Sequence, residues 1–142
     1  MNLGKADNGE TIDLRFAEMI IEENQYSYKD KQGNQKGVVF GGITTSKLRN
    51  LLDMVNNVYT KVMNDKNKML SDEIINDLEY MRVKFAYESG RDSNVKEFID
   101  KTYVRKSLLV VIDKGEREIL LEYCRYFEAL IAYAKFYGMG SN

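Results

Sequence analysis

The 142-residue sequence lacks proline, histidine and tryptophan, and it contains a single cysteine, Cys124. Because proline is absent, the strongest helix breaker is missing from every segment. Because histidine is absent, the chain lacks the commonest general base and metal ligand of proteins. One cysteine excludes an intrachain disulfide and a thiolate metal cluster. We therefore interpret Cys124 as a residue of the core or its boundary.

Long hydrophobic runs are also missing. No apolar stretch approaches the roughly 20 residues that a membrane-spanning helix needs. The first ten residues are polar and lack the basic and apolar regions of a signal peptide. The sequence therefore predicts a cytoplasmic protein without a membrane partner.

Neither sign of charge is in excess, because 21 Lys and Arg residues face 22 Asp and Glu residues, a formal net charge of −1. A nucleic-acid site, if present, must therefore come from local segregation of charge. Hydrophobic residues make up 44% of the chain and charged residues 30%, which is typical of a soluble globular domain. The length suits one domain with its own core.

Apolar residues recur at helical spacing along most of the chain, and this pattern predicts an all-α fold. We expect a compact bundle of five to six helices with no sheet of consequence. The expected helices lie at about 12–24, from Thr44–Ser46 to a polar stretch at 64–68, from Ser71 to a capping Gly90, from Asp92 or Ser93 onward, at 108–112 and at about 116–137. The segment 108–112 would also suit a strand, but no other segment offers it a strand partner.

The chain is predicted to form one helical domain, residues 1–142, with its helical core at about 43–137 and a tail at 138–142. Residues 25–42 are expected to form a flexible loop, because residues 29–37 are polar and rich in glycine. The apolar residues 38–40 could form a brief strand. We favour the interpretation that they dock the loop onto the core.

The outward side of the third predicted helix carries Tyr80, Lys84, Tyr87 and Arg91, which fall within about 60° of one another on a helical projection. Cations neutralise phosphates and aromatic rings stack on bases or ribose, so this mixture suits RNA. The alternative is an ordinary solvated face with tyrosines at its rim.

The second predicted helix has a polar stripe, which comprises Lys47, Asn50, Met54, Asn57 and Lys61. Asn and Lys can contact phosphate and sugar without reading sequence, although an ordinary polar surface would look the same. Arg49 lies on the other flank beside Asp53, with which it could form an ion pair.

The last predicted helix is apolar nearly all round. Leu121 and Phe136 point away from its main stripe, and the small residues Ala129 and Ala132 lie beside Arg125 on that side. Such a helix is either central in the bundle or used in a second contact, so we expect self-association or a partner surface here.

Catalytic motifs are missing from the sequence. It has no phosphate-binding glycine motif and no paired metal-ligand spacing. The acidic pair Asp72–Glu73 lies at a predicted helix start, where it has a structural reason. We therefore predict a protein that is not an enzyme and that needs no metal or cofactor.

Two stretches resemble the small subunit of the type III-A CRISPR Csm interference complex. The first is GITTSKLRNLL at residues 42–52 with VNNVY at 55–59. The second combines EYMRVKFAYESGRD at 79–92, VKEF at 95–98 and YCRYFEALIAYAKFY at 123–137. These motifs occur in the family's order and spacing over about residues 43–137. The first forty residues do not match strongly, so the resemblance assigns them no role.

The resemblance implies a non-catalytic subunit in antiviral defence that stacks head-to-tail with its own copies. Such subunits lie beside backbone subunits that hold the CRISPR RNA, and they contact mainly the target strand of the guide–target duplex without reading its sequence. RNA cleavage would belong to the backbone subunits. DNA cleavage and cyclic oligoadenylate synthesis would belong to the large polymerase-like subunit.

The basic residues within the matching motifs are the RNA-binding candidates that the resemblance implies: Lys84, Arg91, Lys47, Arg49, Arg82, Arg125 and Lys135. Lys84 and Arg91 come first and Lys47 second, because the resemblance and the outward face agree there. Arg82 and Lys135 come last, since Arg82 borders the core stripe and Lys135 can pair with Glu128.

Two other functions are compatible with the sequence. One is a helical protein-interaction adaptor without nucleic-acid contact, which the near-neutral charge and the apolar last helix support. The other is a small nuclease that holds Mg²⁺ with Asp and Glu, which would degrade RNA in a metal-dependent reaction.

Overall fold

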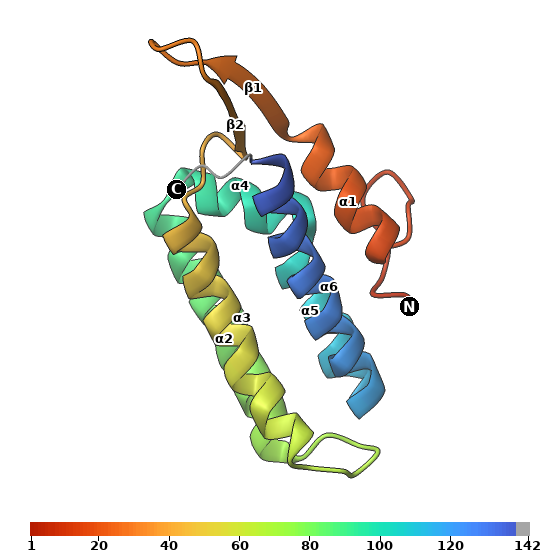
Figure 1. The fold of residues 1–142 in the computed structure, drawn as a ribbon. Coiled ribbons are helices and arrows are strands. Elements are labelled where there is room, and N and C mark those ends of the chain that lie inside the picture. The colour runs from red at the N-terminus through yellow and green to blue at the C-terminus, as the bar shows by residue number, and fades with distance from the viewer. Residues whose placement is uncertain (139–142) are drawn as a thin grey trace.

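The computed structural model describes residues 1–138, in which six helices and one β-hairpin follow each other along the chain (Figure 1). The elements are α1 (Leu14–Glu23), β1 (Gln25–Lys29), β2 (Gln35–Val39), α2 (Thr45–Met63), α3 (Asp72–Arg91), α4 (Ser93–Thr102), α5 (Val104–Lys114) and α6 (Arg117–Tyr137). The all-α prediction is confirmed. Most of the predicted tail, residues 139–142, lies outside the described part.

Side-chain caps start four of the helices, three of them at residues that the sequence pattern had indicated. Thr44, Ser71 and Asp92 accept backbone N–H bonds at the starts of α2, α3 and α4, and Asp13 does so for α1. Each cap satisfies a donor that the helix leaves unpaired and contributes about 1 kcal/mol. These helix starts are therefore encoded locally.

Two helix boundaries differ from the prediction. Gly90 does not end α3, because the helix continues to Arg91 and Asp92 both closes it and caps α4. The segment 108–112 is helical, as predicted, but it belongs to the longer helix α5. Gly115, with φ 64°, ends α5 in the left-handed conformation that glycine adopts without strain.

The expectation of a loop at residues 25–42 was wrong for most of the segment. β1 and β2 pair antiparallel, with Tyr28 opposite Lys36. The turn between them is closed by Asp30, whose backbone N–H donates to the Asn34 carbonyl at 3.0 Å, and by Gly33 with φ 82°. The sequence pattern did not predict this hairpin, because most of its side chains face solvent and show no apolar alternation.

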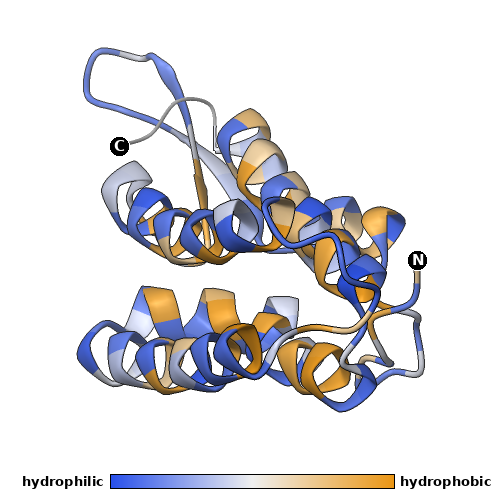
Figure 2. Cartoon of the chain, turned by 90° about the horizontal axis from the view of Figure 1, so that it is seen from below, coloured by the Kyte–Doolittle hydropathy of each residue, from blue (hydrophilic) through white to orange (hydrophobic). Residues whose placement is uncertain are grey.

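The last helix, α6, lies at the centre of the bundle and packs against α1, α2, α5 and β2. Hydrophobic segments gather on the sides of the helices that face one another, whereas the hairpin is largely hydrophilic (Figure 2). Leu121 was expected to point away from the core, but only 7% of its surface is exposed. A helix surrounded on several sides buries more than one stripe, which explains this correction.

The junction between α4 and α5 lies inside the core and breaks the regular helical bonding. Tyr103 there has φ 60°, a left-handed conformation that is uncommon for a residue with a side chain. Tyrosines of α6 satisfy the neighbouring carbonyls: the Tyr123 hydroxyl donates to Val104 at 2.6 Å and the Tyr126 hydroxyl to Thr102 at 2.7 Å. Burial raises the pKa of both phenols well above the ordinary value, so both stay protonated as donors.

Candidate nucleic-acid interface

The outward face of α3 displays two tyrosine–cation pairs. The Lys84 ammonium lies 4.8 Å from the centre of the Tyr80 ring, and the Arg91 guanidinium lies 5.3 Å from the centre of the Tyr87 ring. Tyr80 is 60% exposed and Tyr87 is 62% exposed. Each cation is four residues after its ring, so helical spacing alone brings the partners together. The predicted outward position of these four residues is confirmed.

A groove of about 490 Å³ separates this face from α2. Its walls carry Tyr80 and Lys84 from α3 and Asn57 and Lys61 from α2. The two helices run side by side in opposite directions (Figure 1). The structure thus joins, along one groove, two polar stripes that were recognised separately in the sequence.

Lys61 is engaged within the protein, although its own helix places no acid beside it. Its ammonium lies 2.8 Å from Asp77 and 3.7 Å from Glu73, both on α3. The hydrogen bond to Asp77 is the main reason that the pKa of Lys61 is raised. Lys61 therefore offsets part of the acidic charge of the groove, whereas Lys84 in its lining meets no carboxylate among residues 1–138.

The other two leading candidates meet carboxylates at the far end of the α2–α3 pair. Lys47 lies 4.0 Å from Asp92, and Arg91 lies 3.4 Å from Glu88. Both cations are substantially exposed, so these ion pairs contribute little and can exchange for phosphate. Lys84 has no ion pair within residues 1–138, which makes it the most available of the three.

Arg82 faces a different part of the molecule. It lines a pocket of about 420 Å³ with Tyr103, Arg105 and Lys106, next to α5. The Arg105 Nε donates to the Arg82 carbonyl at 3.0 Å, and the buried Arg82 Nε has no hydrogen-bond partner among the described residues. Sequence reasoning missed Arg105 and Lys106, because it began the helix after them.

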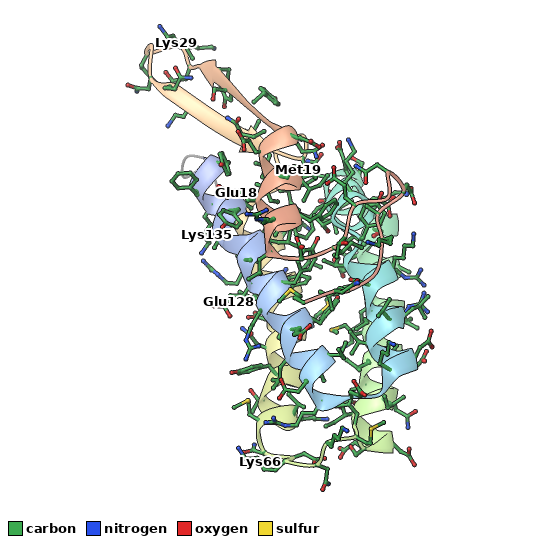
Figure 3. The ribbon with its side chains drawn as sticks, turned by 90° about the vertical axis from the view of Figure 1, so that its right-hand side faces the viewer. Glu18, Met19, Lys29, Lys66, Glu128 and Lys135 are labelled. Carbon is green, nitrogen blue, oxygen red and sulfur yellow. The ribbon has the colours of Figure 1, made fainter. Side chains whose placement is uncertain are left out.

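The remaining candidates are dispersed. Arg49 is exposed on α2, while Arg125 and Lys135 are exposed on α6. Glu128 and Lys135 lie along one side of α6 (Figure 3), but they form no ion pair within the described part of the chain. The structure therefore does not bring these three residues into the α2–α3 groove.

Cys124 is buried, and burial raises the pKa of its thiol to about 12 despite the opposing influence of Arg125. Within residues 1–138 no group of three or more Cys, Asp and Glu side chains is arranged to hold a metal ion. In the same residues, no helix combines the length and the apolar character that crossing a membrane requires.

Comparisons with known proteins place the chain among the subunits of CRISPR effector complexes. The family described as Csm2 Type III-A matches residues 23–140. The chain belongs to this family, the small subunits of type III-A Csm complexes, and the resemblance inferred from its motifs is thereby confirmed.

Relatives that carry the description "CRISPR system Cms protein Csm2" include proteins from three species. The protein from Enterococcus italicus is 56% identical over 140 residues, 99% of each chain. The one from Streptococcus thermophilus is 41% identical over 110 residues, 78% of this chain and 80% of the relative. A Mycobacterium tuberculosis protein is 35% identical over 94 residues, 66% of this chain and 74% of the relative.

Proposed function

We propose that this Csm subunit is a non-catalytic, cytoplasmic RNA-binding protein that holds ribose-phosphate on the outward face of α3. The two tyrosine–cation pairs, Tyr80–Lys84 and Tyr87–Arg91, are the observation that carries the proposal. Lys84 and Arg91 would neutralise phosphates, while the exposed rings would support sugars or bases. Contacts with phosphate, sugar and the faces of bases carry no sequence information, so binding is expected to be indifferent to sequence.

The geometry supports this function through preorganisation. A cation already held over an aromatic ring loses less freedom when a phosphate arrives. The groove beside Lys84 adds the Asn57 amide from α2, which can donate to phosphate or ribose oxygens. Lys47 would extend the contact at the α2 start after exchanging Asp92 for phosphate. Arg49, Arg82, Arg125 and Lys135 remain weaker RNA-binding candidates, because they lie away from this groove.

The same proposal includes contacts with the target RNA strand, the other Csm subunits and neighbouring copies of this chain. Head-to-tail stacking requires two different complementary surfaces on each copy. Phe136 on α6 is 71% exposed, and Ala132 beside it is exposed as well. An exposed aromatic residue next to a small one suits close packing of another subunit. We therefore assign this end of α6 to protein contacts.

The test is target-RNA retention by the assembled complex carrying Lys84→Ala with Arg91→Ala. Removing two phosphate contacts should weaken binding about tenfold or more and reduce its salt dependence. The matched control is Lys96→Ala with Lys101→Ala, which removes two exposed cations from α4. Unchanged RNA retention by the α3 variant, with an intact fold, would contradict the proposed interface.

The adaptor alternative predicts a different result. If the chain makes only protein contacts, a photoreactive target RNA should not crosslink to it in the purified complex. Crosslinks on the α3 face support RNA binding, whereas their absence together with normal complex assembly supports the adaptor. The isolated chain should leave RNA intact in the presence of Mg²⁺, and degradation would favour the nuclease alternative.

A further inference from the structure

The hairpin of β1 and β2 has no role in the proposed α3 interface. It projects from the helices (Figure 1), and Lys29 at its outer end lies at the opposite end of the molecule from Lys66 in the α2–α3 connection (Figure 3). Its base is anchored by the buried residues Val39 and Phe40. The Phe40 ring packs edge-on against Phe98 with centroids 5.3 Å apart. The base of the hairpin is therefore packed against the helical core, while its outer half extends beyond the helices.

Two tyrosines occupy one face of this projecting hairpin. Tyr26 is 56% exposed and Tyr28 is 46% exposed. They lie two residues apart on β1, so they share a face, with ring centroids 6.3 Å apart. Lys36 is directly opposite Tyr28 and shares this face as well. Exposed aromatic rings beside a cation form a platform on which bases can stack.

The hairpin also concentrates positive charge. Residues 25–37 contain Lys29, Lys31 and Lys36 against one acid, Asp30, a net charge of +2 on a chain whose net charge is −1. The Asp30 carboxylate accepts backbone N–H bonds from residues 32 and 34, at 3.0 and 2.9 Å. None of the three lysines forms an ion pair within residues 1–138, in contrast to Lys47, Lys61 and Arg91.

We infer that the hairpin is a second RNA contact, which binds single-stranded RNA by stacking bases on Tyr26 and Tyr28 and by pairing phosphates with Lys29, Lys31 and Lys36. This inference rests on the proposed RNA-binding function. It adds a separate site, since the hairpin lies outside the α2–α3 groove. A protein partner is disfavoured as occupant, because Lys36 beside the rings and two further unpaired lysines on the same hairpin suit a polyanion better than an apolar protein surface.

The experiment measures binding of the full chain to a fluorescein-labelled 20-nucleotide single-stranded RNA of mixed sequence by anisotropy. Tyr26→Thr with Tyr28→Thr removes the rings but keeps residues that favour strands. It should weaken binding at least about tenfold, because each stacked base contributes about 1–3 kcal/mol and both rings are lost. Tyr26→Phe with Tyr28→Phe keeps the stacking faces and should bind within about twofold of the unchanged chain.

A second variant tests the charges. Lys29→Ala, Lys31→Ala and Lys36→Ala together should reduce the slope of log affinity against log salt by about 2, because each single-strand phosphate contact contributes about 0.7. The matched control is Lys66→Ala, Lys68→Ala and Lys114→Ala, which removes the same charge from exposed positions elsewhere. The control should change the slope by less than about 0.5. Circular dichroism and thermal unfolding verify that every variant remains folded.

The outcomes separate the two proposals. Hairpin variants that bind RNA normally, while Lys84→Ala with Arg91→Ala binds weakly, overturn the hairpin site and leave the α3 interface standing. Failure of the unchanged chain to bind the RNA, together with no RNA crosslink in the assembled complex, overturns both. Hairpin variants that bind RNA normally but no longer enter the complex identify a protein contact and overturn the inference. Thiouridine crosslinks to Tyr26 or Tyr28 in the complex support it.

Discussion

The hydroxyl of Tyr126 on α6 donates a hydrogen bond of 2.7 Å to the backbone carbonyl of Thr102, and both residues are fully buried. Thr102 is the last residue of α4, directly before the left-handed Tyr103. Where one helix ends and the next begins inside a core, backbone carbonyls are left without a helical donor and without water. The Tyr126 hydroxyl replaces the missing helical donor to the Thr102 carbonyl. This hydrogen bond connects the central helix to the α4–α5 junction.

Replacing Tyr126 by Phe should lower the free energy of unfolding by about 1–3 kcal/mol. The ring remains in place, but the Thr102 carbonyl loses its donor in a dry environment. Urea unfolding followed by circular dichroism measures the change. Tyr133→Phe is the matched control on the same helix, because Tyr133 is only half-buried. Equal stability of both variants would show that water reaches the junction.

Cys124 should resist alkylation in the folded protein. Burial raises the pKa of its thiol to about 12, so almost no thiolate is present at pH 8. Iodoacetamide should therefore react far more slowly with the native chain than with the chain in guanidinium, as followed by mass spectrometry. Similar rates in both states would mean that the thiol is accessible and ionised.

Tyr137 should make stability depend on pH in the alkaline range. Its hydroxyl donates to Glu18 at 2.9 Å, and this hydrogen bond raises the pKa of Tyr137 from 10.0 to about 12. Because the folded state favours the neutral phenol, the stabilisation is complete below pH 10 and is lost as the pH rises towards 12. The difference in unfolding free energy between the unchanged chain and Tyr137→Phe should therefore shrink over this range. Tyr59→Phe is the comparison variant, because it removes a phenol hydroxyl at an exposed position on α2.

The ion pairs in the α2–α3 groove predict which of its two lysines, Lys61 or Lys84, contributes more to RNA affinity. Lys61→Ala should weaken RNA binding less than Lys84→Ala does, because Asp77 and Glu73 engage the Lys61 ammonium and its loss acts on RNA only by leaving these carboxylates unneutralised. Lys84→Ala should weaken binding by about three- to tenfold, since its charge is free to meet a phosphate. Anisotropy titrations of the two variants at one salt concentration make the comparison. A larger loss for Lys61→Ala would reverse the assignment of the groove.

Much of the interface could be predicted from the sequence because its parts lie four residues apart on one helix. The pairs Tyr80–Lys84 and Tyr87–Arg91 follow from helical geometry, which a single segment determines. The acids that engage Lys61 could not be predicted, because they lie on another helix. Arg82 was grouped with Lys84 by motif, yet it lines a separate pocket with Arg105.

The sequence by itself determined the helical class, the family and the starts of α2, α3 and α4, because periodicity and capping act over three or four residues. Only the tertiary structure decided that Leu121 is buried, that residues 25–39 pair as a hairpin and that Lys61 is neutralised from α3. These outcomes depend on which surfaces meet across the fold. Side chains far apart in the chain acquire their burial and their partners only when the helices pack.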